Sequence, residues 1–431
     1  MTTQSIPRRP ARRAQAGAPR QQVSHGAGFW IVAAAFTSLM AFGTAQTPLW
    51  PLYEARDGFG STTVTVAFAV MVVGAAASLF FLGHLSDRLG RRRIIVPALM
   101  IAIAAASTFT AWPELPGLIA GRLLTGVALG LMASTATAYL ADLFRAEHPE
   151  APDSKVPGVV STAANLGGLA LGPLVVGILA QWAPDPLTTP YVVAGAVLFI
   201  ALLLVLISPE TVDRELRSQQ RPAKFALRPG SAMAFAGAAA VGFFSFAVMG
   251  LFSSLGAVII RGDLGITSHF IGGLAAFAVF ALSATAQLAL ARLAVPRMLS
   301  AGAITFPLGL ALVAVAMYHP SLWLYLLGAA VSGAGAGLLF KGAITTSATV
   351  AAAGSRAGVL AVYFVIAYIG MGAPSIILTV IDKVVDPRAA MIGFAVVLSA
   401  GAALAVRASL ARPAAGVPPE AVRNETAGRA S

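Results

Sequence analysis

The chain has 431 residues, of which 58% are hydrophobic and only 11% are charged, and its mean hydropathy is +0.82. Soluble domains usually carry about 25% charged residues, so this composition excludes a water-soluble globular protein and makes membrane lipid the solvent for most of the chain. There is no cysteine, and the five histidines form no pair at metal-ligand spacing. We therefore expect no disulfide, metal site or cofactor.

Twelve apolar stretches are long enough to cross a bilayer as helices. The first, 29–50, is longer than the core of a signal peptide, so we interpret it as a retained membrane helix behind a basic tail, 1–28. The predicted spans are 29–50, 62–82, 94–112, 115–141, 157–182, 190–208, 231–260, 269–291, 298–318, 321–341, 356–381 and 389–410.

The positive charges predict how these spans are oriented. If the N-terminus is cytoplasmic, 23 of the 29 lysines and arginines fall in cytoplasmic loops and tails, and 4 fall in outer loops. Such a bias favours an even number of spans with both termini inside the cell. It also explains the net charge of +12 without nucleic acid as a partner.

The longest internal polar segment, 209–230, divides the spans six and six. Many transporters consist of two six-helix halves joined in this way. We predict an all-α integral membrane protein with one bundle over 29–208, a second over 231–410, a cytoplasmic linker between them and a cytoplasmic C-terminal tail, 411–431.

The connection after the second span carries the sharpest motif in the chain, GHLSDRLGRRR from Gly83. Gly83 has no side chain and would let two helices approach closely. Gly90 can take the positive φ that a tight turn needs. Asp87, at the membrane edge, needs a partner, which Arg91 can supply from four residues away. Asp142 ends the fourth span on the same side and can join them.

This segment resembles the G-x-x-x-D-x-x-G-R-[KR] signature of the major facilitator superfamily, and it matches every key position. The resemblance covers 29–410 and is closest to the twelve-helix drug or metabolite exporters. It implies a conformational gate made of Gly83, Asp87, Arg88, Gly90, Arg91 and Asp142. In the superfamily such a gate locks the halves in the outward-facing state, with Asp87 facing the start of the eleventh span at Gly354. The alternative is a basic loop that only fixes the topology.

Arg122 lies inside the fourth span, where a charge costs at least about 2.5–3.5 kcal/mol on insertion scales. Glycines follow it at +4 and +8, Gly126 and Gly130. The pattern resembles the superfamily's fourth-helix motif, whose arginine is implicated in proton coupling. The alternative is a side chain that snorkels to the outer interface.

The fifth span contains GGLALGPLVVG from Gly167. It resembles the superfamily's antiporter motif, G-x3-G-P-x2-G-G, although Val176 replaces the first glycine of the closing pair. The resemblance favours export over import. The alternative is ordinary packing of a helix bent at its proline. The matching residues are Gly168, Gly172, Pro173 and Gly177.

Three further polar residues lie in predicted spans. Gln46 in the first and Asn165 in the fifth either line a cavity or bridge helices. Lys341, at the inner end of the tenth, is interpreted as snorkelling to the interface. No acidic residue lies deep in a span, so the sequence identifies no proton-carrying residue.

We interpret the chain as a secondary active transporter in the cytoplasmic membrane, and not as an enzyme. It would move a small, lipophilic drug- or metabolite-like solute by alternating access, through proton-coupled efflux, as a monomer whose partners are the solute, protons and membrane lipid. The alternatives are an importer of the same fold and a membrane sensor that does not transport. A membrane-embedded enzyme would need convergent acids or histidines, which the sequence lacks. The alanine- and arginine-rich composition suggests an actinobacterium.

Overall fold

The computed structural model describes residues 23–83, 85–212 and 225–410, without the side chain of Asp87, and this part of the chain is helical. Twelve helical segments are long and apolar enough to cross a membrane, which confirms the predicted all-α fold. The helices are α1 (His25–Thr44), η1 (Thr47–Leu49), α2 (Trp50–Asp57), α3 (Ser61–Leu82), α4 (Leu85–Leu89), α5 (Arg91–Ala111), α6 (Leu115–Glu147), α7 (Val156–Trp182), α8 (Thr189–Ile207), α9 (Ala232–Ser254), α10 (Gly256–Gly262), α11 (His269–Ala289), α12 (Val295–Tyr318), α13 (Leu322–Val350), α14 (Arg356–Ile381) and α15 (Pro387–Leu410).

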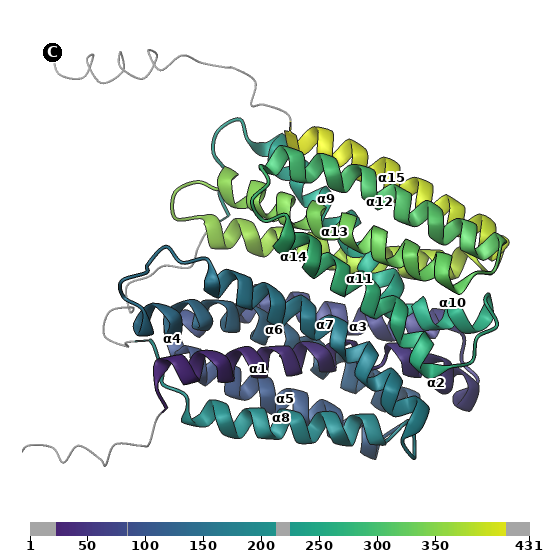
Figure 1. Cartoon of the computed structure of the whole chain (residues 1–431), viewed down its shortest axis with the longest axis horizontal. Coiled ribbons are helices and arrows are strands. Elements are labelled where there is room, and N and C mark those ends of the chain that lie inside the picture. Colours follow the sequence, from purple (N-terminus) through teal and green to yellow (C-terminus); the bar gives the residue numbers. More distant parts are fainter. Residues whose placement is uncertain (1–22, 84, 213–224, 411–431) are drawn as a thin grey trace, which may run out of the picture.

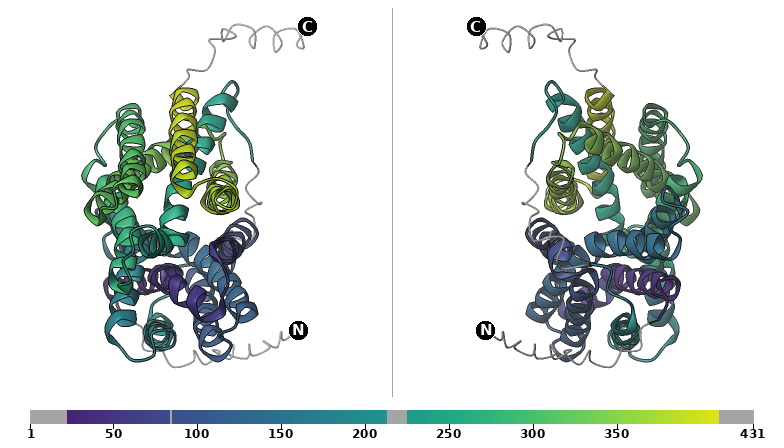
Figure 2. Two further views of the ribbon diagram at one scale, coloured as in Figure 1. Left: turned by 90° about the vertical axis from the view of Figure 1, so that its right-hand side faces the viewer. Right: turned by 90° about the vertical axis from the view of Figure 1, so that its left-hand side faces the viewer.

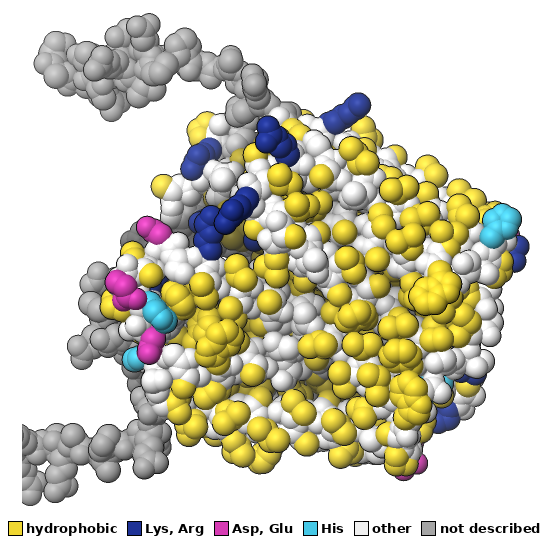
Figure 3. All heavy atoms as spheres, in the orientation of Figure 1, with side chains coloured by type: hydrophobic (Ala, Val, Ile, Leu, Met, Phe, Trp, Pro, Cys, Tyr) yellow, Lys and Arg dark blue, Asp and Glu magenta, His cyan; other side chains and the backbone are white. Residues whose placement is uncertain are grey.

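The helices form two bundles, α1–α8 and α9–α15, which lie one above the other in Figures 1 and 2. We call the end of the molecule that carries α4 the motif end, and the opposite end the far end. The described chain enters α1 and leaves α15 at the motif end (Figure 1). On the face shown in Figure 3, hydrophobic side chains cover the middle of the helices and charged side chains lie mainly toward the two ends, as a lipid-facing surface requires.

The first span of each bundle is broken near the far end, which the sequence had predicted as continuous. α1 ends at Thr44, and the chain continues through η1 into α2. Pro48 and Pro51 lack the amide hydrogens that an unbroken helix would use. α9 ends at Ser254, and α10 follows it directly. Each half therefore has the same kind of break in its first span.

Two spans are longer than the sequence indicated. α6 continues to Glu147 and α13 continues to Val350, which is nine residues beyond the predicted end at 341. The polar residues in this part of α13 do not end the helix, because their hydroxyls donate to carbonyls one turn earlier. Thr345 donates to the carbonyl of Lys341 (2.7 Å) and Thr346 to that of Gly342 (3.0 Å).

Glycine allows the closest helix contacts. A Cβ atom added to Gly126 on α6 would overlap the carbonyl oxygen of Met71 on α3, and one added to Gly130 would overlap Ser78 on the same helix. The two glycines that follow Arg122 therefore seat α6 directly on the α3 backbone. Packing of this kind drives helix association in lipid, where burial of apolar surface gives little gain.

This contact predicts that Gly126→Ala destabilises the N-terminal bundle, because the methyl group forces the two backbones apart. Overpacking a tight interior typically costs about 1–3 kcal/mol. The matched control is Gly167→Ala on α7, where an added Cβ meets no atom within 4 Å. The melting temperature of the purified protein in detergent should fall for Gly126→Ala and stay near the wild-type value for Gly167→Ala. Equal melting of the two variants would contradict the packing argument.

Candidate functional site

A cavity of about 1260 Å³ lies between the two bundles. It reaches from residues in the middle of the spans, such as Gly43 and Met371, to residues at the motif end. There its lining includes Gly83 and Arg88 from one bundle and Gly354 from the other. The volume exceeds the roughly 300–1,000 Å³ of most ligand pockets, so a drug-sized molecule would fit.

At the far end the two bundles are in direct contact. Ser268 and the backbone of His269, at the start of α11, both donate to the side-chain oxygen of Gln181 on α7 (3.0 and 2.9 Å). The hydroxyls of Thr65 on α3 and Thr379 on α14 lie 3.1 Å apart and buried. These contacts join the bundles at the far end, whereas the described lining of the cavity extends to the motif end.

The helix breaks take part in this contact. Thr47 in η1 donates to the carbonyl of Ser253, at the end of α9, over 2.8 Å, and both residues are buried. An unbroken helix would use that carbonyl for its own ladder, so the break after α9 frees it for a bond between bundles.

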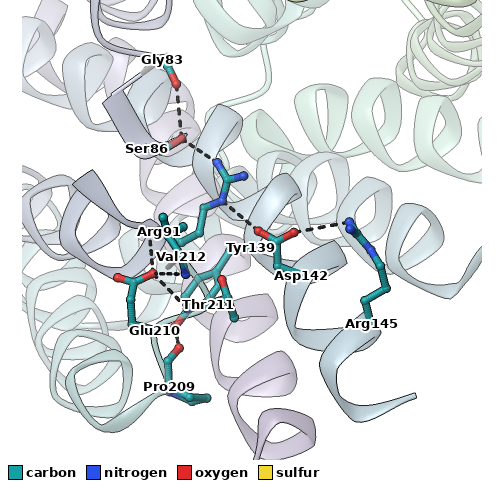
Figure 4. Close-up of polar contacts among 10 residues, drawn as sticks. All are labelled: Gly83, Ser86, Arg91, Tyr139, Asp142, Arg145, Pro209, Glu210, Thr211 and Val212. Carbon is teal, nitrogen blue, oxygen red and sulfur yellow. Dashed lines mark hydrogen bonds and ion pairs between the residues drawn. The ribbon is translucent and has the colours of Figure 1, made fainter. Parts of the chain in front are cut away.

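A polar cluster at the motif end fixes the connection between α3 and α5 (Figure 4). Arg91 is 6% exposed, and its guanidinium donates to Asp142 on α6 (3.0 Å) and to Ser86 on α4 (3.0 Å). Asp142 is also 3.4 Å from Arg145. A buried ion pair is worth keeping only when further hydrogen bonds satisfy its members, and here both members have them.

Glu210 joins this cluster, and sequence reasoning missed it by placing the residue in the linker. One carboxylate oxygen accepts the backbone amide of Arg91 (2.9 Å) as well as those of Thr211 and Val212 (3.1 and 3.3 Å). Arg91 begins α5, so Glu210 caps that helix N-terminus, where a negative charge is favourable. The only signal in the sequence was an acid directly after the sixth span.

Gly90 allows this cap to form. Its φ of +116° is a conformation that residues with a side chain rarely adopt, and an added Cβ would overlap the Glu210 carboxylate. Tyr139 on α6 donates to the carbonyl of Pro209 and so holds the segment that carries Glu210.

Other residues of the predicted gate lie at the mouth of the cavity. The atoms nearest to an added Cβ on Gly83 all belong to Leu79 of the same segment, so Gly83 does not bring two helices together. Gly83 and Arg88 line the mouth opposite Gly354. The Asp87 carboxylate, which the gate hypothesis directs toward Gly354, lies outside the described residues.

Arg122 is buried inside the N-terminal bundle, with 2% exposure, and does not reach an interface. Its guanidinium donates to the Gln46 side chain (2.7 Å) and to the carbonyl of Gly43 (3.3 Å). The same group lies over the rings of Trp50 (5.5 Å) and Phe68 (5.4 Å). Among the described residues no carboxylate pairs with it. Gln46 therefore bridges helices, and neither it nor Arg122 lines the cavity.

The antiporter-like residues on α7 face two partners. Added Cβ atoms on Gly168 and Gly172 would overlap α1, so these glycines seat α7 within its own bundle. Gly177 faces the start of α11 in the other bundle, and Gly273 on α11 packs against the carbonyl of Pro173. The segment thus lies at the contact between bundles.

Two of the three further polar residues noted in the sequence line the cavity. Asn165 does so from α7, as one of its two interpretations required. Lys341 does so from α13, whereas the sequence placed it at a span end. Because α13 continues for nine residues beyond it, Lys341 lies inside a helix and faces the space between the bundles.

The cap predicts that Glu210→Ala destabilises the protein more than Glu210→Gln, because glutamine keeps an oxygen that can accept the three amides. An unsatisfied buried donor costs about 1–3 kcal/mol. Thermal unfolding in detergent measures the difference, with Glu150→Ala in an exposed loop as the control. If Glu210→Ala melted like the wild type, the cap would contribute nothing.

Comparison with known proteins agrees with this architecture. The bacillibactin exporter of Bacillus subtilis is 32% identical over 33% of this chain and 37% of its own length. The glucose transporter GlcP of Staphylococcus epidermidis is 31% identical over 28% of this chain and 24% of its own length. These matches span less than two fifths of either relative.

The fold of the whole chain is also found in solved structures. The nucleoside transporter NupG superposes with a TM-score of 0.65 at 13% identity, covering 90% of this chain and all of that one. The human organic anion transporter MFSD10 gives 0.63 at 18% identity, covering 90% of this chain and all of that one. The sequence model of the Major Facilitator Superfamily matches residues 31–297, more than half of the sequence, and so the chain belongs to that superfamily of transporters.

Proposed function

We propose that this transporter exports a small, lipophilic drug- or metabolite-like solute across the cytoplasmic membrane by alternating access. The observation that carries the proposal is the cavity between the two bundles, which touch at the far end and both line the cavity at the motif end. A carrier of this kind exposes its site to one side at a time by rocking one bundle against the other.

The charge distribution supports a cytoplasmic motif end. Basic residues lie in the connections there, and both described chain ends lie there too. Positively charged loops favour the cytoplasm. In this orientation the cavity faces the cytoplasm, from which an exporter would load its solute.

The gate and coupling residues remain proposals with structural support. Arg91 and Asp142 form an ion pair at the motif end (3.0 Å), while Arg88 and Gly354 line the two sides of the mouth. We propose that rocking brings these two sides together. The proposed coupling ion is the proton. Since no Asp or Glu is among the described residues that line the cavity, we assign coupling to the buried Arg122 group, which lies behind the cavity wall.

Export is favoured over import by the α7 motif, which lies where the two bundles meet. Relatives of both kinds exist, among them the multi-drug resistance efflux pump PmrA of Streptococcus pneumoniae, 28% identical over 37% of this chain. Export and import can be distinguished by measuring how susceptible cells are to a panel of aromatic compounds, and how much of each compound they accumulate. An exporter lowers accumulation when the chain is expressed, and an importer raises it.

Alternating access predicts that tying the far end shut stops transport. The chain has no cysteine, so Gln181→Cys with Ser268→Cys gives a unique thiol pair across the bundles. We expect oxidative cross-linking of the pair to abolish counterflow of the panel's best substrate in proteoliposomes, and a reductant to restore it.

The matched control pair lies within one bundle. Gly26→Cys with Glu147→Cys joins α1 to α6, where the Gly26 amide and the Glu147 carboxylate are 3.0 Å apart. Cross-linking this pair should leave counterflow intact. Persistent exchange by the cross-linked Gln181–Ser268 pair would rule out rocking at the far end, whereas a sensor would bind solute and exchange none in any variant.

A further inference from the structure

We infer that the solute is an amphipathic organic anion, and that Lys341 provides its positive counter-charge. The inference rests on the proposed function in one respect, because it takes the cavity between the bundles as the solute site. It goes beyond that function by naming the substrate class and the residue that selects it.

The described lining of the cavity carries positive charge and no negative charge. Its charged residues are Lys341 and Arg88, and none of its members is Asp or Glu. Arg88 lies in α4 at the mouth, whereas Lys341 lies deeper. Nine residues separate Lys341 from the end of α13 at Val350, which corresponds to about 14 Å along the helix axis. A solute that passes the mouth therefore meets one further cation.

Within the described part of the chain, no carboxylate forms an ion pair with Lys341. An ionisable residue in a span is costly, and it is normally paired or turned to a water-filled cavity where it acts on a substrate or ion. Lys341 is turned to a cavity, since it lines the space between the bundles and is partly exposed. An anionic solute would supply the missing partner.

The wall beside Lys341 is aromatic. Phe340 lies 5.2 Å from Phe246 and 6.2 Å from Phe364 between ring centroids, and Phe246 lies 5.7 Å from Tyr368. All four rings line the cavity. Aromatic faces and edges bind flat apolar groups with a preferred geometry. The C-terminal bundle thus offers an aromatic surface next to a single cation, which fits a ring system that bears an acidic group.

The opposite wall combines apolar side chains with uncharged polar ones. The N-terminal bundle contributes an amide, Asn165, and several hydroxyls: Ser134, Thr137, Ser161 and Thr162. Asn165 lies nine residues from the start of α7, so helical rise places it at about the same depth as Lys341. A solute held between these walls can pair its acidic group with Lys341 while its other polar atoms hydrogen-bond to the opposite bundle.

Binding of three matched probes to the full-length protein in detergent tests the inference without requiring transport. The probes are naphthalene-2-sulfonate, the neutral naphthalene-2-sulfonamide and the cationic 2-naphthylmethylammonium. Isothermal titration should show that the wild type binds the sulfonate about tenfold more tightly than the other two, the factor expected for one charge-assisted contact. Lys341→Met should lose this preference, Lys341→Arg should keep it, and Lys341→Glu should favour the ammonium.

Lys155→Met, in an exposed loop, is the control for a general loss of positive charge and should bind as the wild type does. Melting temperatures of all variants identify any that fail to fold, and the Lys341→Arg and Lys341→Glu variants then carry the comparison. The inference is overturned if the wild type binds the three probes equally or binds none, or if Lys341→Met keeps the sulfonate preference. A wild type that binds the sulfonate but shows no counterflow would reject the transporter proposal and leave the anion site standing.

Discussion

Hydrocarbon offers no hydrogen bonds, and this constraint governs every part of the structure. Backbone groups in the spans must be satisfied within helices, so the fold is all-α, and each polar side chain needs a partner inside the protein or a place beside water. The few ionisable groups in the spans obey this requirement in two ways. Arg122 is enclosed by an amide, a carbonyl and two rings, while Lys341 faces the cavity.

The same constraint explains why glycine shapes the bundles. Apolar side chains gain little by leaving lipid for one another, so helix association depends on close packing. Gly126 and Gly130 bring α6 onto the backbone of α3, and Gly168 and Gly172 bring α7 onto α1. Between the bundles, side-chain hydrogen bonds lie toward the far end, where Gln181 accepts from Ser268 and the hydroxyls of Thr65 and Thr379 meet.

Breaks in the helices have a different consequence. Where α1 and α9 end, backbone carbonyls lose their own ladder partners and become available to other segments. The Thr47 hydroxyl donates to such a carbonyl, that of Ser253, and this bond joins equivalent positions of the two halves. At the motif end, the first amide of α5 has no partner within its own helix, and it donates to the Glu210 carboxylate. Helix termini therefore carry many of the polar contacts that set the relative positions of segments.

The sequence by itself determined the solvent, the fold and the family, because apolar length, basic loops and the motif from Gly83 are all local in the chain. It also identified Arg122 and Asp142 as residues that need partners, since a charge in or beside a span is costly wherever it points. Only the tertiary structure decided which partners they have, that Gln46 serves Arg122 and not the cavity, and that Glu210 caps α5. It also showed that Lys341, which the sequence placed at a span end, lines the cavity. These outcomes depend on where helices end and which faces meet, and such features arise from contacts between segments far apart in the chain.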